Sequence, residues 1–452
     1  MSILQALLLL LLKEKFKNKS HANLRLRPNV CRLWKGMVII MQNKLSLLIS
    51  CIIVLLLFTS CSKQYNTSNT YIPYQDYQYT YNNQGSFSDI AESEDGYYFL
   101  SGFYLYYADK TTMNPVILCN KPNCLHSDET DPEKITSCNA CFPGIRSGGS
   151  VSYFDGNVYI LERDSSDKSG TAYQLIKLSK DGTKRKTVLH FKYTPSSLAI
   201  HRGKVYVAGR VYDENGTSIY GVSEYDLSKT ASQKPVTIFE GKIPDGNIQD
   251  LICYGQNIYF REFAMNSEIT TVRIQHYNLN TKKSACIMQE KGNSFPAHIA
   301  FHHDHIQYSY TTLDYTTGEV TQTHNYMCEL DGSKAKEIFS TDNYQTLYSD
   351  GKYIYLDDVK WSPFSKPADK LSLIVADSDG NAIASTPTGS YSKTSSQIIC
   401  GSAEHLFLKN QTDTTYQILY ANKDKFETGK IDFHLMFEME LDKMTPGHKI
   451  DN

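Results

Sequence analysis

Five thiol and imidazole side chains lie within 23 residues of this chain, at Cys119, Cys124, His126, Cys138 and Cys141. Cysteine and histidine at such short spacings can hold Zn²⁺ tetrahedrally. Outside the cytoplasm the same cysteines can instead form disulfides, and free thiols are a third possibility. Zinc or disulfides would cross-link a loop that cannot bury a core of its own. The pattern therefore predicts a stapled loop, and it leaves zinc and disulfides open as the means.

A turn followed by a short aromatic strand recurs about every 50 residues and predicts the elements that must position this loop. A second turn phrase, such as Asp181-Gly182, falls between neighbouring copies. Asp-Gly and Asn-rich pairs make hairpin turns because they tolerate positive φ. Each repeat therefore holds about four strands. The copies of the first phrase contain Asp95-Gly96, Asp155-Gly156, Arg202-Gly203, Gly255-Gln256, His303-Asp304, Asp350-Gly351 and Ala403-Glu404.

Small repeated sheets of this length are typical of a β-propeller. We predict an all-β fold with seven four-stranded blades over residues 87–440 and a Cys-rich insertion at 115–147. Ring closure would remove exposed strand edges. Six or eight blades, a β-sandwich and an open solenoid are the alternatives. The polar, Tyr-rich stretch 71–86 is interpreted either as a mobile linker or as an outer strand that completes the last blade.

The first 60 residues form a leader with nine Lys/Arg and one Glu. Its apolar run 45–58 is too short to span a membrane. The basic flank, apolar core and small residues at the end predict an export signal. Phe58-Thr59-Ser60-Cys61 resembles the lipobox of bacterial lipoproteins, although Phe58 stands where that family prefers Leu. The resemblance implies that Cys61 is lipidated and anchors the chain to the outer face of the cell membrane.

The predicted organisation is therefore a leader and lipoprotein signal peptide at 1–60, a lipidated Cys and polar tether at 61–86, the propeller, and a C-terminal tail at 441–452. The body after the leader carries 37 Lys/Arg against 47 Asp/Glu. This mildly acidic balance argues against nucleic acid as a partner. We expect the protein to be attached to the membrane through the N-terminal lipid.

The phrase Cys-Asn-Lys-Pro-Asn-Cys-Leu-His at residues 119–126, together with the turn phrases, resembles TolB-like and YVTN-like propellers. The resemblance is strongest to the propeller lipoproteins of Gram-positive anaerobes, whose first blade often carries Cys-Asn-Lys-Pro-x-Cys-x-His. It covers most of the mature chain. It implies the fold and an extracytoplasmic location, and it implies no activity.

We predict that the protein is not an enzyme and that one propeller face binds a protein, peptide or glycan. The sequence contains no zinc-protease helix motif, nucleophile elbow or phosphate-binding Gly loop. A propeller-type glycan lyase or hydrolase is one alternative, and a structural scaffold of an envelope complex is another. Structural zinc is the one cofactor that the sequence suggests, and no motif marks the residues that would bind the partner.

Overall fold

A computed structural model describes residue 65 and residues 67–444 of the 452, with short gaps. The gaps are at 84–86, 127–130, 148, 169, 192–193, 213–217, 244–245, 266–269, 293, 303, 314–319, 342–343, 359–372, 387–390 and 392–395. Cys61, the leader and the end of the predicted tail lie outside the described residues. No helix among the described residues has the length and apolar character needed to cross a membrane.

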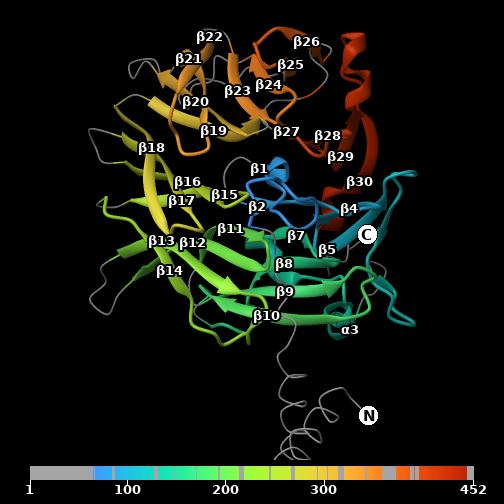
Figure 1. Ribbon diagram of the computed structural model, residues 1–452. Helices are drawn as coiled ribbons and strands as arrows, with labels where there is room; N and C mark the ends of the chain where they lie inside the picture. Colours follow the sequence, from blue (N-terminus) through green and yellow to red (C-terminus); the bar gives the residue numbers. More distant parts are fainter. Residues whose placement is uncertain are drawn as a thin grey trace, which may run out of the picture. The chain divides into compact units, whose positions relative to one another are not determined.

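Seven four-stranded antiparallel sheets surround a common axis, so the predicted seven-bladed β-propeller is confirmed (Figure 1). In each of these seven blades the four strands lie side by side in chain order. Blade 1 consists of β3 (Ile90–Glu92), β4 (Gly96–Ser101), β5 (Tyr104–Asp109) and β6 (Pro115–Ile117). Blade 2 consists of β7 (Ser150–Phe154), β8 (Asn157–Arg163), β9 (Tyr173–Ser179) and β10 (Arg185–Phe191). Blade 3 consists of β11 (Pro195–His201), β12 (Lys204–Tyr212), β13 (Ser218–Asp226) and β14 (Val236–Glu240).

The remaining blades follow the same order along the chain. Blade 4 consists of β15 (Asn247–Tyr254), β16 (Asn257–Met265), β17 (Thr270–Asn278) and β18 (Lys283–Gly292). Blade 5 consists of β19 (Ser294–His302), β20 (His305–Leu313), β21 (Val320–Glu329) and β22 (Lys336–Thr341). Blade 6 consists of β23 (Tyr344–Ser349), β24 (Ile354–Asp358), β25 (Leu373–Ala376) and β26 (Ala382–Ser385). Blade 7 consists of β27 (Ser396–Ile399), β28 (His405–Gln411), β29 (Thr415–Asn422) and β30 (His434–Glu440).

The repeated turn phrase joins the first and second strands of the blades. In blade 2, Asp155 and Gly156 have φ of 50° and 73°, and in blade 3 Arg202 and Gly203 have φ of 47° and 79°. Two successive positive φ values define the two-residue turn whose twist matches that of antiparallel strands. All these turns lie at one face of the ring, which we call the turn face. The opposite face, which carries the connections between second and third strands, is the loop face.

The aromatic residue that follows each turn packs between blades and forms the core. A second-strand side chain can be buried on both sides because neighbouring blades cover it, and large aromatic rings fill the widening space between them. The Tyr and Phe residues at these positions are buried in six blades: Tyr97, Tyr159, Tyr206, Tyr259, Tyr355 and Phe407.

No strand from the described residues 71–83 belongs to blade 7, so the interpretation of 71–86 as an outer strand of the last blade is wrong for this part of the stretch. Blade 7 takes all four strands from β27–β30. The junction of blades 1 and 7 is instead filled by Phe437, whose ring lies 4.7 Å from Tyr106 and 5.3 Å from Phe99. An ion pair between Lys409 and Asp89 adds to this junction.

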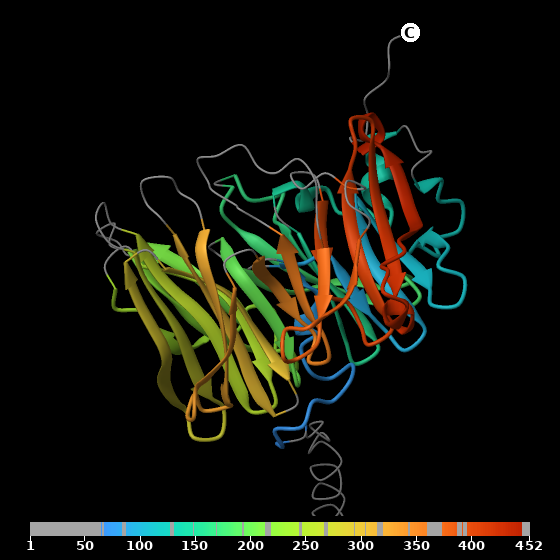
Figure 2. The same cartoon turned by 90° about the horizontal axis from the view of Figure 1, so that it is seen from above.

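Residues 65–83, which we call the strap, cross the turn face at the axis of the ring (Figures 1 and 2, blue). The strap includes the short helix η1 (Tyr79–Tyr81) and ends in β1 (Asn82–Asn83), which pairs with β2 (Phe87–Ser88). Its backbone carbonyls accept hydrogen bonds from turn residues of three blades: Tyr74 from Asp155 at 3.0 Å, Gln75 from Arg202 at 2.9 Å, and Thr80 from Gly401 at 3.1 Å.

The other described helices are short and lie outside the sheets. They are α3 (Pro132–Ser137), η3 (Pro143–Ser147), η4 (Lys423–Thr428) and η5 (Leu441–Met444). The first two belong to the predicted insertion at 115–147. Its first residues, Pro115–Ile117, form β6, the outer strand of blade 1, and the rest of the insertion follows that strand.

Candidate metal centre

Four of the five predicted side chains come together in the insertion. The ligand atoms of Cys119, Cys124, His126 and Cys138 all lie within 4.8 Å of one another. The Sγ of Cys138 lies 3.7 Å from Nδ1 of His126. Cys119 and Cys138 are buried, and the other two are half-buried. The set is therefore a compact Cys₃His group at the edge of the propeller.

Local backbone geometry directs these side chains to one point. Cys119 lies two residues after the end of β6. A turn in which Cys124 N–H donates to the Lys121 carbonyl at 3.4 Å brings Cys124 back towards it. Asn123 and His126 have φ of 61° and 54°, in the left-handed region that Asn and His adopt more readily than most residues. These two positive φ values fold residues 119–126 into a tight loop.

The fourth ligand is placed by α3. Asp131 caps the start of this helix by accepting a hydrogen bond from Glu133 N–H at 3.0 Å, as N-caps do. The helix ends at Cys138, whose N–H donates to the Ile135 carbonyl at 3.1 Å. The helix thus returns the chain to the Cys119 thiol.

Backbone N–H groups point at two of the sulfurs. Those of Lys121 and Asn139 donate to Cys119, and that of Ala140 donates to Cys138. Burial opposes ionisation of Cys119, but these donors and the neighbouring thiols bring its pKa below the ordinary value. Burial, together with the nearby Cys119, raises the pKa of Cys138. One thiolate forms readily here, and further thiolates require a cation beside them.

The insertion is fastened to both blade 1 and blade 2. Leu105 N–H donates to the Ala140 carbonyl at 2.9 Å, and Phe142 N–H donates to the Phe103 carbonyl at 2.7 Å. From blade 2, the Arg185 guanidinium stacks on the Phe142 ring at 4.2 Å. It also donates to the Cys141 carbonyl at 2.6 Å. The metal-binding group therefore sits at the junction of two blades.

Cys141 lies apart from the Cys₃His group. It forms an isolated antiparallel bridge with Tyr104 of β5, which directs its side chain into the core of blade 1. Burial raises the pKa of this thiol to about 11. The eight cysteines in the described part of the chain are all free thiols, Cys141 included. The Cys-x-x-Cys spacing at 138–141 thus contributes one ligand to the cluster.

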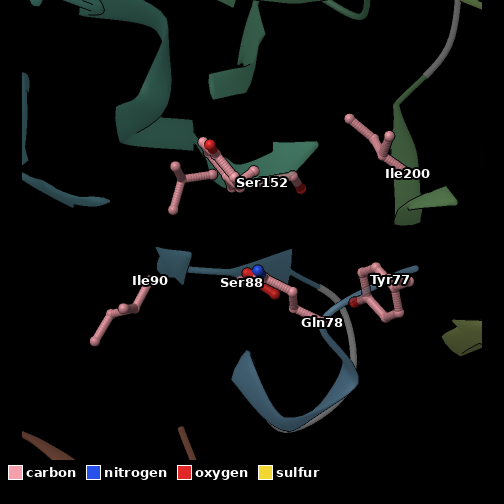
Figure 3. Close-up of a pocket in the computed structure, with 8 residues that line it drawn as sticks. Tyr77, Gln78, Ser88, Ile90, Ser152 and Ile200 are labelled. Atoms are coloured by element: carbon pink, nitrogen blue, oxygen red, sulfur yellow. The ribbon is translucent and has the colours of Figure 1, made fainter. Parts of the chain in front are cut away.

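The strap leaves little space where it meets the inner strands. A cavity of about 10 Å³ lies between Tyr77 and Gln78 of the strap and Ser152 and Ile200 of blades 2 and 3 (Figure 3). This is about the room of a single water molecule. A wider, open groove of about 640 Å³ runs beside the insertion, lined in part by Tyr98, Leu118 and Lys180.

No family model and no curated protein matches this sequence. Among solved structures, prolyl oligopeptidase B from Galerina marginata, bound to a 35mer substrate, has a TM-score of 0.50 and 10% identity over 80% of this chain. The tricorn protease has a TM-score of 0.46 and 11% identity over 81%. The propeller domain of the Trilobed protease from Pyrococcus furiosus has a TM-score of 0.39 and 13% identity over 64%.

The match covers 51% of the oligopeptidase, 35% of the tricorn protease and 92% of the Trilobed propeller domain. The chain thus spans about a third to a half of the length of the first two. The prediction that the protein is not an enzyme is wrong by this comparison, because the structure with a TM-score of 0.50 is that of a peptidase. At 10–13% identity the likeness shows the fold alone, so it assigns neither a reaction nor a substrate.

Proposed function

We propose that Cys119, Cys124, His126 and Cys138 bind one structural Zn²⁺ that holds the insertion in its fold. The proposal is carried by the convergence of four ligand atoms within 4.8 Å of one another. Tetrahedral Zn²⁺ with ligand distances of about 2.3 Å to sulfur and 2.0–2.1 Å to nitrogen separates neighbouring ligand atoms by about 3.6–3.8 Å. The 3.7 Å between Cys138 Sγ and His126 Nδ1 fits this spacing.

The chemistry of the set favours a structural zinc ion. Three sulfurs and one nitrogen complete the four positions that structural zinc uses, whereas catalytic zinc keeps one position for water. A disulfide between any two of Cys119, Cys124 and Cys138 would leave the third thiol without a partner. The bound zinc would neutralise the thiolates and cross-link the chain after β6 to the end of α3.

Elemental analysis of the purified, full-length protein tests this proposal. We expect about one Zn²⁺ per chain, with the ligand thiols protected from alkylation until a chelator is added. Cys138→Ser should lose the metal, whereas Cys141→Ser, a matched control from the same insertion, should keep it. A metal-free protein whose thiols react only after reduction would establish the disulfide instead. Equal metal content in the two variants would also contradict the proposed ligand set.

We further propose that the protein is an extracytoplasmic lipoprotein related to the TolB-like propellers, anchored through Cys61, whose loop face binds a protein, peptide or glycan. The lipobox-like sequence before Cys61 supports the anchor. The strap supports the choice of face, because it crosses the turn face at the axis of the ring and is hydrogen-bonded to the turns there. Incorporation of a labelled fatty acid in wild-type cells, and its loss in Cys61→Ala, is the expected result. Equal labelling of the two proteins would rule out this anchor.

Crosslinking the protein in intact cells tests the partner. A reproducible crosslink from loop-face residues to one protein, peptide or wall glycan is expected. Crosslinks formed mainly from the outer strands of the blades would favour a scaffold within an envelope complex.

A further inference from the structure

The chain enters the propeller at the turn face and is held there from Tyr65 onward. The Tyr65 ring packs against Phe154 with ring centroids 5.7 Å apart. The edge of the Tyr65 ring lies so close to Gly203 that a Cβ at this position would clash with it. Four residues later, Asn69 Oδ1 accepts a hydrogen bond from Gln256 N–H at 3.2 Å. The contacts of Tyr65 and Asn69 are with residues at the turn-face ends of blades 2, 3 and 4.

The buried side chain of Arg202 fixes this entry point. Its guanidinium donates to the carbonyls of Ser68 at 2.8 Å and Thr70 at 2.9 Å. It also forms a bidentate pair with the buried Asp76, at 2.6 and 2.8 Å. Charge-assisted bidentate pairs are among the stronger hydrogen bonds in proteins. Arg202 therefore joins the start of the strap to blade 3 through four hydrogen bonds.

Three residues separate Cys61 from Tyr65. Four residue steps of fully extended chain span at most about 14 Å. The strands that run between the two faces reach ten residues, as in β18, and ten residues at about 3.3 Å each give about 33 Å. A lipid on Cys61 is therefore too close to the turn face for the loop face to reach the same bilayer.

We propose that the turn face of the propeller lies against the membrane surface and that the loop face points away from it. This orientation rests on the proposed lipidation of Cys61. The partner is a phospholipid bilayer, and the short tether to the strap sets the geometry. Three of the basic side chains at the rim of the turn face are paired with carboxylates: Lys180 with Asp95 at 2.7 Å, Lys204 with Asp226 at 2.8 Å, and Lys334 with Glu329 at 3.1 Å. We expect the short tether, rather than attraction to anionic lipid, to set the orientation.

Lysine acetylation with a water-soluble reagent tests the orientation on the full-length lipidated protein. The protein is placed on phosphatidylcholine–phosphatidylglycerol vesicles and compared with unlipidated Cys61→Ala by peptide mass spectrometry. The exposed Lys229, Lys282 and Lys425 belong to turn-face hairpins, whereas the exposed Lys168 and Lys242 lie in loop-face connections. The first three should react several-fold more slowly on vesicles, and the last two should be unchanged. Raising the salt to about 0.5 M, which screens surface charge, should not change this pattern.

Two controls separate the possible failures. Flotation of the same sample with the vesicles reports the lipid anchor, so a protein that does not float refutes the anchor and the orientation together. A protein that floats but shows slowed loop-face lysines, or equal rates on both faces, overturns the orientation alone. Insertion of about 15 Gly/Ser residues after Gln64 adds about 20 Å of flexible reach and should restore turn-face reactivity without loss of flotation. Protection that persists in this variant would overturn the tether as its cause.

Discussion

Two segments of this molecule stand outside the repeat, and one arginine fastens each of them to the ring. Arg202 in blade 3 donates to the strap carbonyls of Ser68 and Thr70 and pairs with Asp76. Arg185 in blade 2 donates to the insertion carbonyl of Cys141 and lies 3.5 Å from Glu162 of its own blade. A planar donor with five N–H groups suits both tasks, because backbone carbonyls in a curved segment find no strand partner.

The two segments differ in where they lie against the ring. The strap places Tyr77 and Tyr81 in the core, and Tyr79 packs edge-on against Phe301 at 5.0 Å. The insertion buries Ile135 and Phe142 in the core of blade 1, but it lies at the outer edge of the propeller and leaves Leu125 exposed. A segment that inserts aromatic rings between blades gains enough apolar contact to stay folded. A segment at the edge needs a cross-link, which the Cys₃His group can supply.

Removing a metal ligand should have the largest effect on amide exchange, and this effect should be confined to the insertion. In Cys119→Ser, or after chelation, the insertion should open, because structural zinc supplies much of the folding energy of such loops. Amide exchange at Leu105, Ala140 and Phe142 should accelerate by roughly two orders of magnitude or more. Exchange in the strap, at Asp76 and Tyr77, should stay as it is.

The measurement is peptide-resolved hydrogen exchange, with Cys141→Ser as the matched control. Unchanged exchange in the insertion would mean that it folds without metal. Faster exchange in both segments would mean that they form one cooperative unit, and the contrast between them would be lost.

Arg202→Met should give the next largest loss, in the strap. The substitution leaves the buried Asp76 carboxylate with Ile72 N–H as its remaining donor, at 3.1 Å, and it removes the donors to two carbonyls. Breaking a buried pair by removing one partner typically costs about 3–5 kcal/mol. Urea unfolding measures the free energy of unfolding, and Arg210→Met in the same blade is the matched control.

The control should lose only about 1–2 kcal/mol, because Arg210 is half-buried, so that water can replace part of what is lost, and it donates to the Gly246 carbonyl at 2.5 Å. Equal losses in the two variants would show that the strap adds nothing to the stability of the ring.

Most of the propeller could be predicted from sequence because each blade repeats the same local signals. Asp155-Gly156 and Arg202-Gly203 form the predicted two-residue turns, with both φ values positive. The aromatic residues after them are buried as packing between blades requires. These features depend on two to four neighbouring residues, so a single sequence contains them.

The role of the strap could not be predicted, because its partners are distant in sequence. Its Tyr, Gln and Asn residues have the composition of a polar tether, yet Tyr77 N–H donates to Nδ1 of His201, 124 positions away. The metal ligands are an intermediate case. Spacing placed Cys119, Cys124, His126 and Cys138 together, but it could not show that Cys141 turns away, since the bridge to Tyr104 depends on the fold of blade 1.

Acid should weaken the attachment of the strap through His201. Burial lowers the pKa of this imidazole from 6.5 to about 4, with the nearby Arg202 acting in the same direction and Asp76, 3.8 Å away, opposing it. Neutral His201 accepts from Tyr77 N–H at 3.1 Å and bonds the Gly255 carbonyl at 2.8 Å. Its protonation would disrupt the first of these bonds.

The unfolded chain binds the proton below about pH 6.5, and the folded chain does so only below about pH 4. The stabilisation is therefore complete above pH 6.5 and is lost as the pH falls through this window. It amounts to about 3 kcal/mol in all and about 2 kcal/mol between pH 7 and pH 5. Urea unfolding at both pH values should show this difference in wild type and in the exposed control His190→Gln. A slope that survives in His201→Gln would assign the effect to other groups.

The smallest effect is expected for Arg185→Met, at the attachment of the insertion. The Arg185 side chain is 23% exposed, so water can reach part of the site after the substitution. Glu162 would keep hydrogen bonds from Gly144 N–H and Gln174 Nε2, both at 3.1 Å, and Met can still cover the Phe142 ring. A loss of about 1–2 kcal/mol in the free energy of unfolding follows from the lost bonds to the insertion carbonyls.

With zinc bound, the insertion of Arg185→Met should keep its slow amide exchange. After chelation, Arg185→Met should open further than wild type, because the arginine is one of the few hydrogen-bonding groups, with Asn120 and Asn139, that join the insertion to blade 2. If amide exchange in the variant equals that of wild type in both states, Arg185 is not needed to hold the insertion in place. Arg185 and Arg202 would then share a bonding geometry but not a role in stability.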